Sequence, residues 1–225
     1  VTAEQGRSIC LHTAEVLRRA DAGDPLHAKL MRIMTPLIKF RTCRDARKVT
    51  GDGMEVRGGS GYIEEWSDAR VLRDAHLGSI WEGTSNVVAL DVKRAIRREG
   101  SLEALKTYAA QLLGNSGIPA QSREKLAAAH ARACALAEAV AQAPEREDDV
   151  RRMATGLYNS MSAIIMAWEA ARSRNWRRLA LAHLVFQHKL AIQDPLAPSS
   201  DAGALIERLI RNQEIDEETA RAALA

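Results

Sequence analysis

The sequence has 225 residues, of which 46% are hydrophobic and only 4% are aromatic. Its 32 basic and 29 acidic side chains leave a net charge of +3, and this near balance gives no reason by itself to expect a nucleic-acid partner. The apolar runs are far too short to span a membrane, and the N-terminus lacks the basic and then apolar pattern of a secretion signal.

The cysteines and histidines do not form a metal-binding pattern. The sequence has an odd number of cysteines, Cys10, Cys43 and Cys134, and no two of them stand at a metal-ligand spacing. The histidines are scattered singly in the same way. We therefore expect a reduced, cytoplasmic protein with no metal centre.

The amino-acid composition predicts an all-α fold, because alanine, arginine, leucine and glutamate dominate and favour helices. Pro36 should kink or break the second helix, which ends near 51–53 or continues to Val56. Ser122 and Pro144 are expected to begin the sixth and seventh helices. The expected helices are 2–22, 25–56, 68–77, 86–98, 101–113, 122–143, 144–168, 175–192, 202–212 and 217–224, with loops at 58–66, 194–195 and 198–200.

Two motifs interrupt the helical pattern in the first half. The first is the glycine-rich loop from Gly58 to Tyr62, and the second is the turn Trp81-Glu82-Gly83-Thr84. Glycine lets the backbone pass close to a ligand. The helix that follows the turn directs its free N–H groups at whatever lies there. The alternative is a capped helix–helix turn with a solvated glutamate.

Together, these motifs resemble the C-terminal helical domain of the acyl-CoA dehydrogenase family. That family combines a Gly-Gly-x-Gly-Tyr loop, an Arg-Asp pair, here Arg73-Asp74, and an aromatic-Glu-Gly-Thr turn. The finer match, through Met54-Glu55-Val56 and Leu90-Asp91-Val92, is to the AidB-like branch. The resemblance covers about residues 28–96. It implies a helical bundle over residues 1–99, followed by a C-terminal helical extension over residues 100–225.

The resemblance implies a reaction and a site. The family removes two hydrogens from adjacent carbons of an acyl-CoA thioester, and Glu82 stands at the position of its base. Thr84 and Asn86 stand where the family contacts FAD, although Asn86 replaces the usual glutamine. The loop glycines, which are Gly58, Gly59 and Gly61, stand where the family approaches the FAD of a neighbouring subunit. A homo-oligomer that shares FAD is therefore expected.

Several features leave alternatives open. Glu55 replaces a common glutamine on the adenine side, and Arg73-Asp74 are expected to form structural ion pairs. The family's two preceding domains supply much of the flavin pocket, so the isolated chain is expected to bind FAD weakly or not at all. A second hypothesis is an AidB-like DNA-associated or scaffolding module with a vestigial flavin site. Its candidate contacts are the densest basic stretch, Arg172, Arg174, Arg177, Arg178 and Lys189 with His183 and His188. Because the stretch has few aromatic residues, we expect a solvated basic face there rather than DNA contact.

Overall fold

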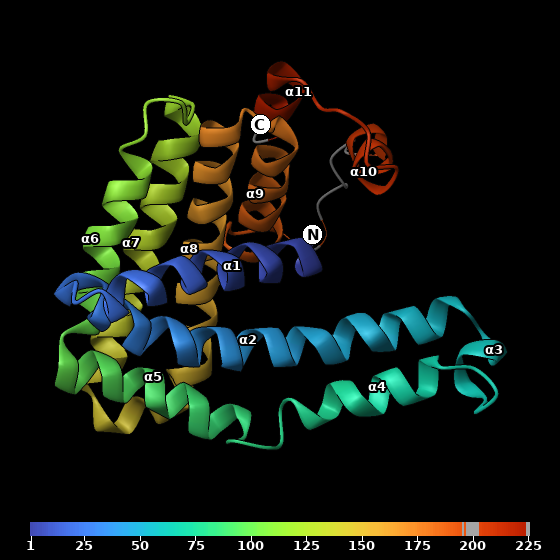
Figure 1. Cartoon of the computed structure of the whole chain (residues 1–225), viewed down its shortest axis with the longest axis horizontal. Helices are drawn as coiled ribbons and strands as arrows, with labels where there is room; N and C mark the ends of the chain where they lie inside the picture. The colour runs from blue at the N-terminus through green and yellow to red at the C-terminus, as the bar shows by residue number, and fades with distance from the viewer. Residues whose placement is uncertain (195, 197–202, 224–225) are drawn as a thin grey trace.

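The computed structural model describes residues 1–194, 196 and 203–223, and every regular element in these ranges is helical (Figure 1). The all-α prediction is confirmed. The helices are α1 (Thr2–Asp21), α2 (Pro25–Val56), α3 (Gly59–Tyr62), α4 (Asp68–Leu77), α5 (Ser85–Glu99), α6 (Ser101–Leu113), α7 (Ala120–Gln142), the 3-10 helix η1 (Pro144–Asp149), α8 (Val150–Ser173), α9 (Trp176–Lys189), α10 (Gly203–Ile210) and α11 (Glu217–Ala222).

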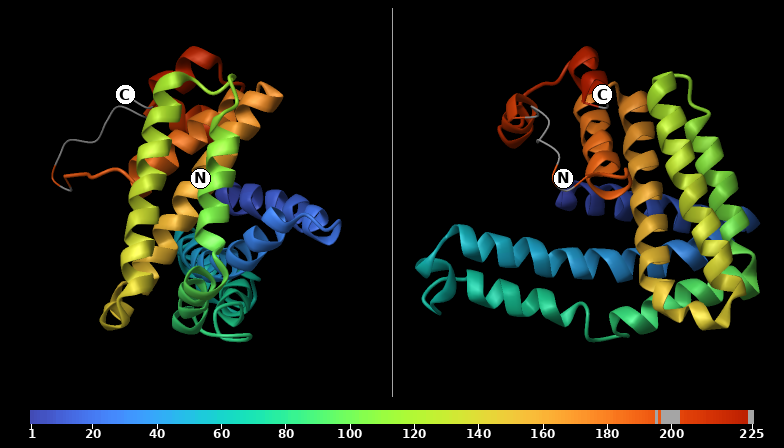
Figure 2. Two further views of the ribbon diagram at one scale, coloured as in Figure 1. Left: turned by 90° about the vertical axis from the view of Figure 1, so that its left-hand side faces the viewer. Right: turned by 180° about the vertical axis from the view of Figure 1, so that it is seen from behind.

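The long helix α2 organises the first half of the chain. Asp24 starts α2, because its carboxylate accepts the backbone N–H groups of Leu26 and His27 at 2.9 and 3.2 Å. Helix α1 packs along α2 on one side, and α4 and α5 run back along α2 on the other. The α2–α4 pair projects away from the rest of the molecule and carries α3 at its tip (Figure 2).

The second half stands on this base as a bundle of α6, α7, α8 and α9, steeply inclined to α1 and α2 in Figure 1. Helix α8 lies at the centre and packs against α1, α2, α5, α6, α7 and α9. Its buried face contains Met153, Leu157, Met161 and Ile164, each with no exposed surface, while Trp168 is only partly buried. These residues recur at helical spacing, so this face of α8 is a central part of the core of the fold.

Some local expectations were wrong. Helix α2 is not broken at Pro36, which is buried inside it. It continues to Val56, which is one of the two ends expected from the sequence. An internal proline costs a helix about 3 kcal/mol, and the packing of α2 against α1, α4 and α5 offsets that cost. The glycine-rich loop contains one helical turn, α3. Ser122 does not begin α7; its hydroxyl lies 2.9 Å from Nε2 of buried His183.

Other boundaries agree with the sequence. Gly100 ends α5 in the left-handed conformation, with φ of 63°, as a C-terminal glycine usually does. Pro144 begins a helical turn, but the turn is 3-10 and precedes α8. The expected loop residues Pro195 and 198–200, and helix ends 202 and 224, lie outside the described residues. No helix in the described part of the chain is long and apolar enough to cross a membrane.

Candidate functional site

The turn between α4 and α5 holds Glu82 in an unusual backbone conformation. Its φ is 54°, in the left-handed region, and Gly83 follows with φ of 105°. For a residue with a side chain this region costs roughly 1–2 kcal/mol. Such strain concentrates at functional sites because the surrounding structure must hold it. The residue singled out from the sequence is thus also a backbone outlier.

Thr84 and Asn86 begin α5 with their side chains exposed. Thr84 occupies the N-cap position, but its side chain makes no capping hydrogen bond. The first N–H groups of this 15-residue helix therefore have no side-chain cap from Thr84. Both side chains and the helix end are open to a ligand beside Glu82.

A cavity of about 730 Å³ lies between α2 and α5, and Glu82 is part of its wall. Glu82 is exposed, and no hydrogen bond or ion pair joins it to another residue in the described ranges. The carboxylate is therefore not held by another side chain and is accessible from the cavity. The cavity combines apolar and charged walls, formed by Ala28, Met31, Arg32, Thr35, Pro36, Lys39, Val87, Val88, Asp91 and Arg94.

An ion-pair brace closes one side of this cavity. Arg32 on α2 donates to both carboxylate oxygens of Asp91 on α5, at 2.9 and 2.8 Å, and also to Glu99 at 2.9 Å. The hydrogen bonds from Arg32 hold the pKa of Asp91 below its usual range. Sequence reasoning gave Arg32 no role, because its partners lie 59 and 67 residues away along the chain. The brace fixes α5, and hence the end of the Glu82 turn that leads into α5, against α2.

The glycine-rich loop lies elsewhere in the fold. It forms the projecting tip at the far end of α4 from the Glu82 turn (Figures 1 and 2). At the tip, Val56 is 87% exposed to solvent and Tyr62 is 75% exposed. The structure therefore brings together Glu82, Thr84 and Asn86 but leaves the loop glycines apart from them. Arg73 pairs with Glu64 at 2.6 Å beside the tip, which confirms a structural ion pair for that arginine.

The three loop glycines differ in what the fold requires of them. Gly58 has φ of 60°, which only glycine adopts readily. A Cβ on Gly61 would stand 2.1 Å from the carbonyl oxygen of Met54, whereas a Cβ on Gly59 would meet nothing within 4 Å. Gly58 and Gly61 thus have a structural reason to be glycine, and Gly59 has none in this chain.

This difference gives a matched pair of variants. Gly61→Ala should open the tip, because the added carbon must displace backbone, at a cost of about 1–3 kcal/mol. Gly59→Ala should leave the tip closed or tighten it, since alanine favours helix. Amide hydrogen exchange of residues 54–62 measures both effects. Equal exchange in the two variants would contradict the steric role of Gly61.

The basic stretch around α9 does not form one exposed face. Arg177 and Arg178 reach Glu4 of α1 at 3.3 and 2.8 Å, and Arg178 also reaches Glu169 at 3.2 Å. The Arg178 side chain is only 13% exposed. These arginines join α1, α8 and α9, so the expectation of a solvated basic face is wrong for them.

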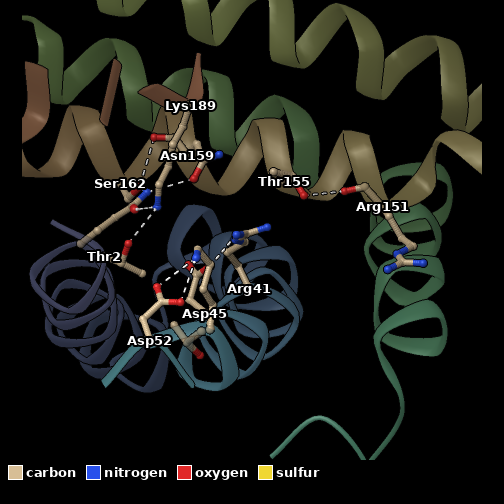
Figure 3. Close-up of polar contacts among 12 residues, drawn as sticks. Thr2, Arg41, Asp45, Asp52, Arg151, Thr155, Asn159, Ser162 and Lys189 are labelled. Atoms are coloured by element: carbon tan, nitrogen blue, oxygen red, sulfur yellow. Dashed lines mark hydrogen bonds and ion pairs between the residues drawn. The ribbon is translucent and has the colours of Figure 1, made fainter. Parts of the chain in front are cut away.

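Two other members of the basic stretch also face inward. Lys189 donates to Gln5 at 2.7 Å, and Gln5 donates in turn to Asn159 and Ser162 at 3.0 and 2.7 Å. Figure 3 shows Lys189 close to Asn159 and Ser162, with Thr2 nearby. Burial lowers the pKa of Lys189. His183 is fully buried. Arg172, Arg174 and His188 remain exposed, and DNA contact through them stays a prediction.

Comparison with known families places the first half of the chain. Residues 1–97 match the family model described as "Acyl-CoA dehydrogenase, C-terminal domain". Acyl-CoA dehydrogenase family member 11 of Caenorhabditis elegans is 36% identical over 111 residues, which are 48% of this chain and 18% of that protein. AidB of Escherichia coli (strain K12) is 39% identical over 92 residues, which are 41% of this chain and 16% of AidB. The chain therefore spans less than a fifth of either relative.

Solved structures extend the likeness beyond the family match. Caenorhabditis elegans ACDH-11, solved in complex with C11-CoA, superposes with a TM-score of 0.75 over 92% of this chain and 37% of that one. At 24% identity this likeness concerns the fold alone. The apo form of Bd2924 superposes with a TM-score of 0.59 at 26% identity, over 72% of this chain and 30% of that one. The helical arrangement of the second half thus has a counterpart in ACDH-11.

Proposed function

From the premise that residues 1–97 belong to the family of acyl-CoA dehydrogenase C-terminal domains, we propose that this chain is the C-terminal part of an FAD-dependent acyl-CoA dehydrogenase. The enzyme removes hydrogens from the α and β carbons of an acyl-CoA thioester. The observation that carries the proposal is Glu82, a carboxylate without a partner in the described part of the chain, held in a left-handed turn at the wall of a 730 Å³ cavity.

Glu82 is the base of the proposed reaction. Its carboxylate takes the proton from the α carbon, and the C–H electrons delocalise onto the thioester carbonyl. A carboxylate does this efficiently only when a dry site raises its pKa and donors stabilise the enolate oxygen. Glu82 is exposed in this chain. In the proposed enzyme, the bound thioester and the remainder of the protein therefore exclude water from it.

The residues at the start of α5 fit a flavin. Thr84 and Asn86 offer an exposed hydroxyl and an exposed amide at a helix N-terminus beside the base. FAD at this place supplies the acceptor for the hydride that leaves the β carbon. Asn86 is shorter than the glutamine usual at this position, so its contact is the weaker of the two.

The loop glycines contribute to a second FAD in the proposed assembly. Gly58, Gly59 and Gly61 lie at the projecting tip, away from Glu82, so they serve the flavin of a neighbouring subunit in a homo-oligomer. Residues 1–99 form the flavin-site part and residues 100–225 the helical extension. The proposed location is the cytoplasm.

Flavin absorbance of the full-length protein tests this function. Mixing with a panel of acyl-CoA thioesters under anaerobic conditions should bleach the oxidised flavin bands. A C11 thioester is the first choice, because ACDH-11 was solved with C11-CoA. A flavoprotein that no thioester reduces would contradict the proposal and favour a vestigial site.

A further inference from the structure

Lys39 of α2 reaches across to the turn that carries Glu82. Its ammonium donates to the carbonyl oxygen of Gly78 at 2.9 Å and to that of Trp81 at 3.1 Å. The same ammonium stands 5.8 Å from the centre of the Trp81 ring, within the range of a cation–π contact. Lys39 and Glu82 also line the same cavity.

The two carbonyls that Lys39 binds lie where α4 ends. Gly78 is the C-cap of α4, and the last carbonyls of a helix lack partners within it and carry the negative end of its dipole. A lysine ammonium satisfies both needs with one group. Lys39 therefore ends α4 and holds the chain beyond it close to α2.

The second carbonyl ties Lys39 to the conformation of Glu82. The Trp81 carbonyl belongs to the peptide group that joins Trp81 to Glu82, and the φ of Glu82 is the rotation about the bond that follows this peptide. Fixing the Trp81 oxygen restricts that rotation to values that keep the turn closed. The left-handed φ of 54° at Glu82 is strained, so without this restraint the turn would relax and carry the carboxylate away.

We infer that Lys39 is a positioning residue that holds the Glu82 carboxylate in place for proton abstraction. This inference rests on the proposed function. It assigns a role to a side chain 43 positions before the base, on another helix that lines the same cavity. The Lys39 ammonium acts through backbone carbonyls and need not touch the substrate.

Two variants and one control test the inference in the full-length flavoprotein. Lys39→Met removes the donors but keeps the length of the side chain, and Lys39→Arg keeps donors and charge. Lys29→Met removes an exposed lysine from the same helix, away from the Glu82 turn. The rate of flavin reduction at saturating thioester should fall about ten- to a hundredfold in Lys39→Met, recover in part in Lys39→Arg, and stay unchanged in Lys29→Met. The thioester concentration that gives half the maximal rate should change less than about twofold, because Lys39 does not need to contact the substrate and substrate binding is retained.

Hydrogen exchange separates this inference from the proposed function. Amides of residues 79–84 should exchange faster in Lys39→Met than in wild type, while those of α8 should be unaffected. Wild-type reduction rates and exchange in Lys39→Met would overturn the positioning role and leave the proposed function standing. A wild-type flavin that no thioester reduces would overturn the proposed function and with it the catalytic part of the inference; faster exchange would then support the anchoring of the turn only.

Discussion

Replacing Glu82 by glutamine should slow the reduction of the bound flavin by acyl-CoA by about two to four orders of magnitude, the usual effect of losing a positioned general base. Glutamine keeps the size of the side chain and its ability to form hydrogen bonds but cannot take up the α proton. The left-handed backbone of the turn should persist, because Lys39 holds the preceding carbonyls. Stopped-flow absorbance of the full-length protein measures the rate.

The flavin content of the variant distinguishes chemistry from assembly. Flavin should remain bound in Glu82→Gln, since the proposed contacts come from Thr84, Asn86 and the loop glycines. Glu65→Gln, which alters an exposed glutamate between α3 and α4, is the matched control and should react at the wild-type rate. If Glu82→Gln is reduced as fast as wild type, the base lies on another segment of the enzyme.

Lowering the pH from 7 to 5 should destabilise this chain by several kcal/mol through the protonation of histidines that the folded state keeps neutral. Three histidines, His12, His130 and His183, are buried, and burial lowers the pKa of each to about 4. In the unfolded chain a histidine has a pKa of about 6.5. The unfolded state therefore binds more protons below pH 6.5, so stability is present above that value and is lost as the pH falls towards 4.

The expected size follows from the pH interval. At pH 5 each of these histidines lowers the free energy of unfolding by about 2 kcal/mol, since one pKa unit corresponds to about 1.4 kcal/mol. If their effects are additive, the three together lower it by roughly 6 kcal/mol. His183 shows why the neutral ring is favoured: its Nδ1 donates to the carbonyl of Ala220 at 2.8 Å, which leaves Nε2 to accept from the Ser122 hydroxyl at 2.9 Å. Protonation would replace that acceptor with a second donor.

Urea unfolding midpoints between pH 7.5 and 5 measure this loss. In His183→Gln the decline of the unfolding free energy with pH should be about one third smaller than in wild type. The exposed His188 provides the control variant, His188→Gln, which should retain the wild-type decline. A stability that is level between pH 7 and 5 would contradict the buried neutral state of these histidines.

Local sequence signals determined most of the helical framework. The periodic apolar residues of α8, Gly100 at the end of α5 and Asp24-Pro25 at the start of α2 are short-range features, and each marks a helix or its end in the structure. The aromatic-Glu-Gly-Thr turn was also visible locally. These features could be read because their physical cause lies within a few residues along the chain.

Tertiary structure decided the rest, because the deciding contacts join residues far apart in sequence. The continuity of α2 through Pro36 depends on α1, α4 and α5 packing around it. The inward turn of Arg178 depends on Glu4, 174 positions away, and the role of Lys39 depends on carbonyls about 40 positions away. A charge pattern or a proline in the sequence indicates which interactions a residue can make. The residues that the fold brings next to it determine which of these interactions form.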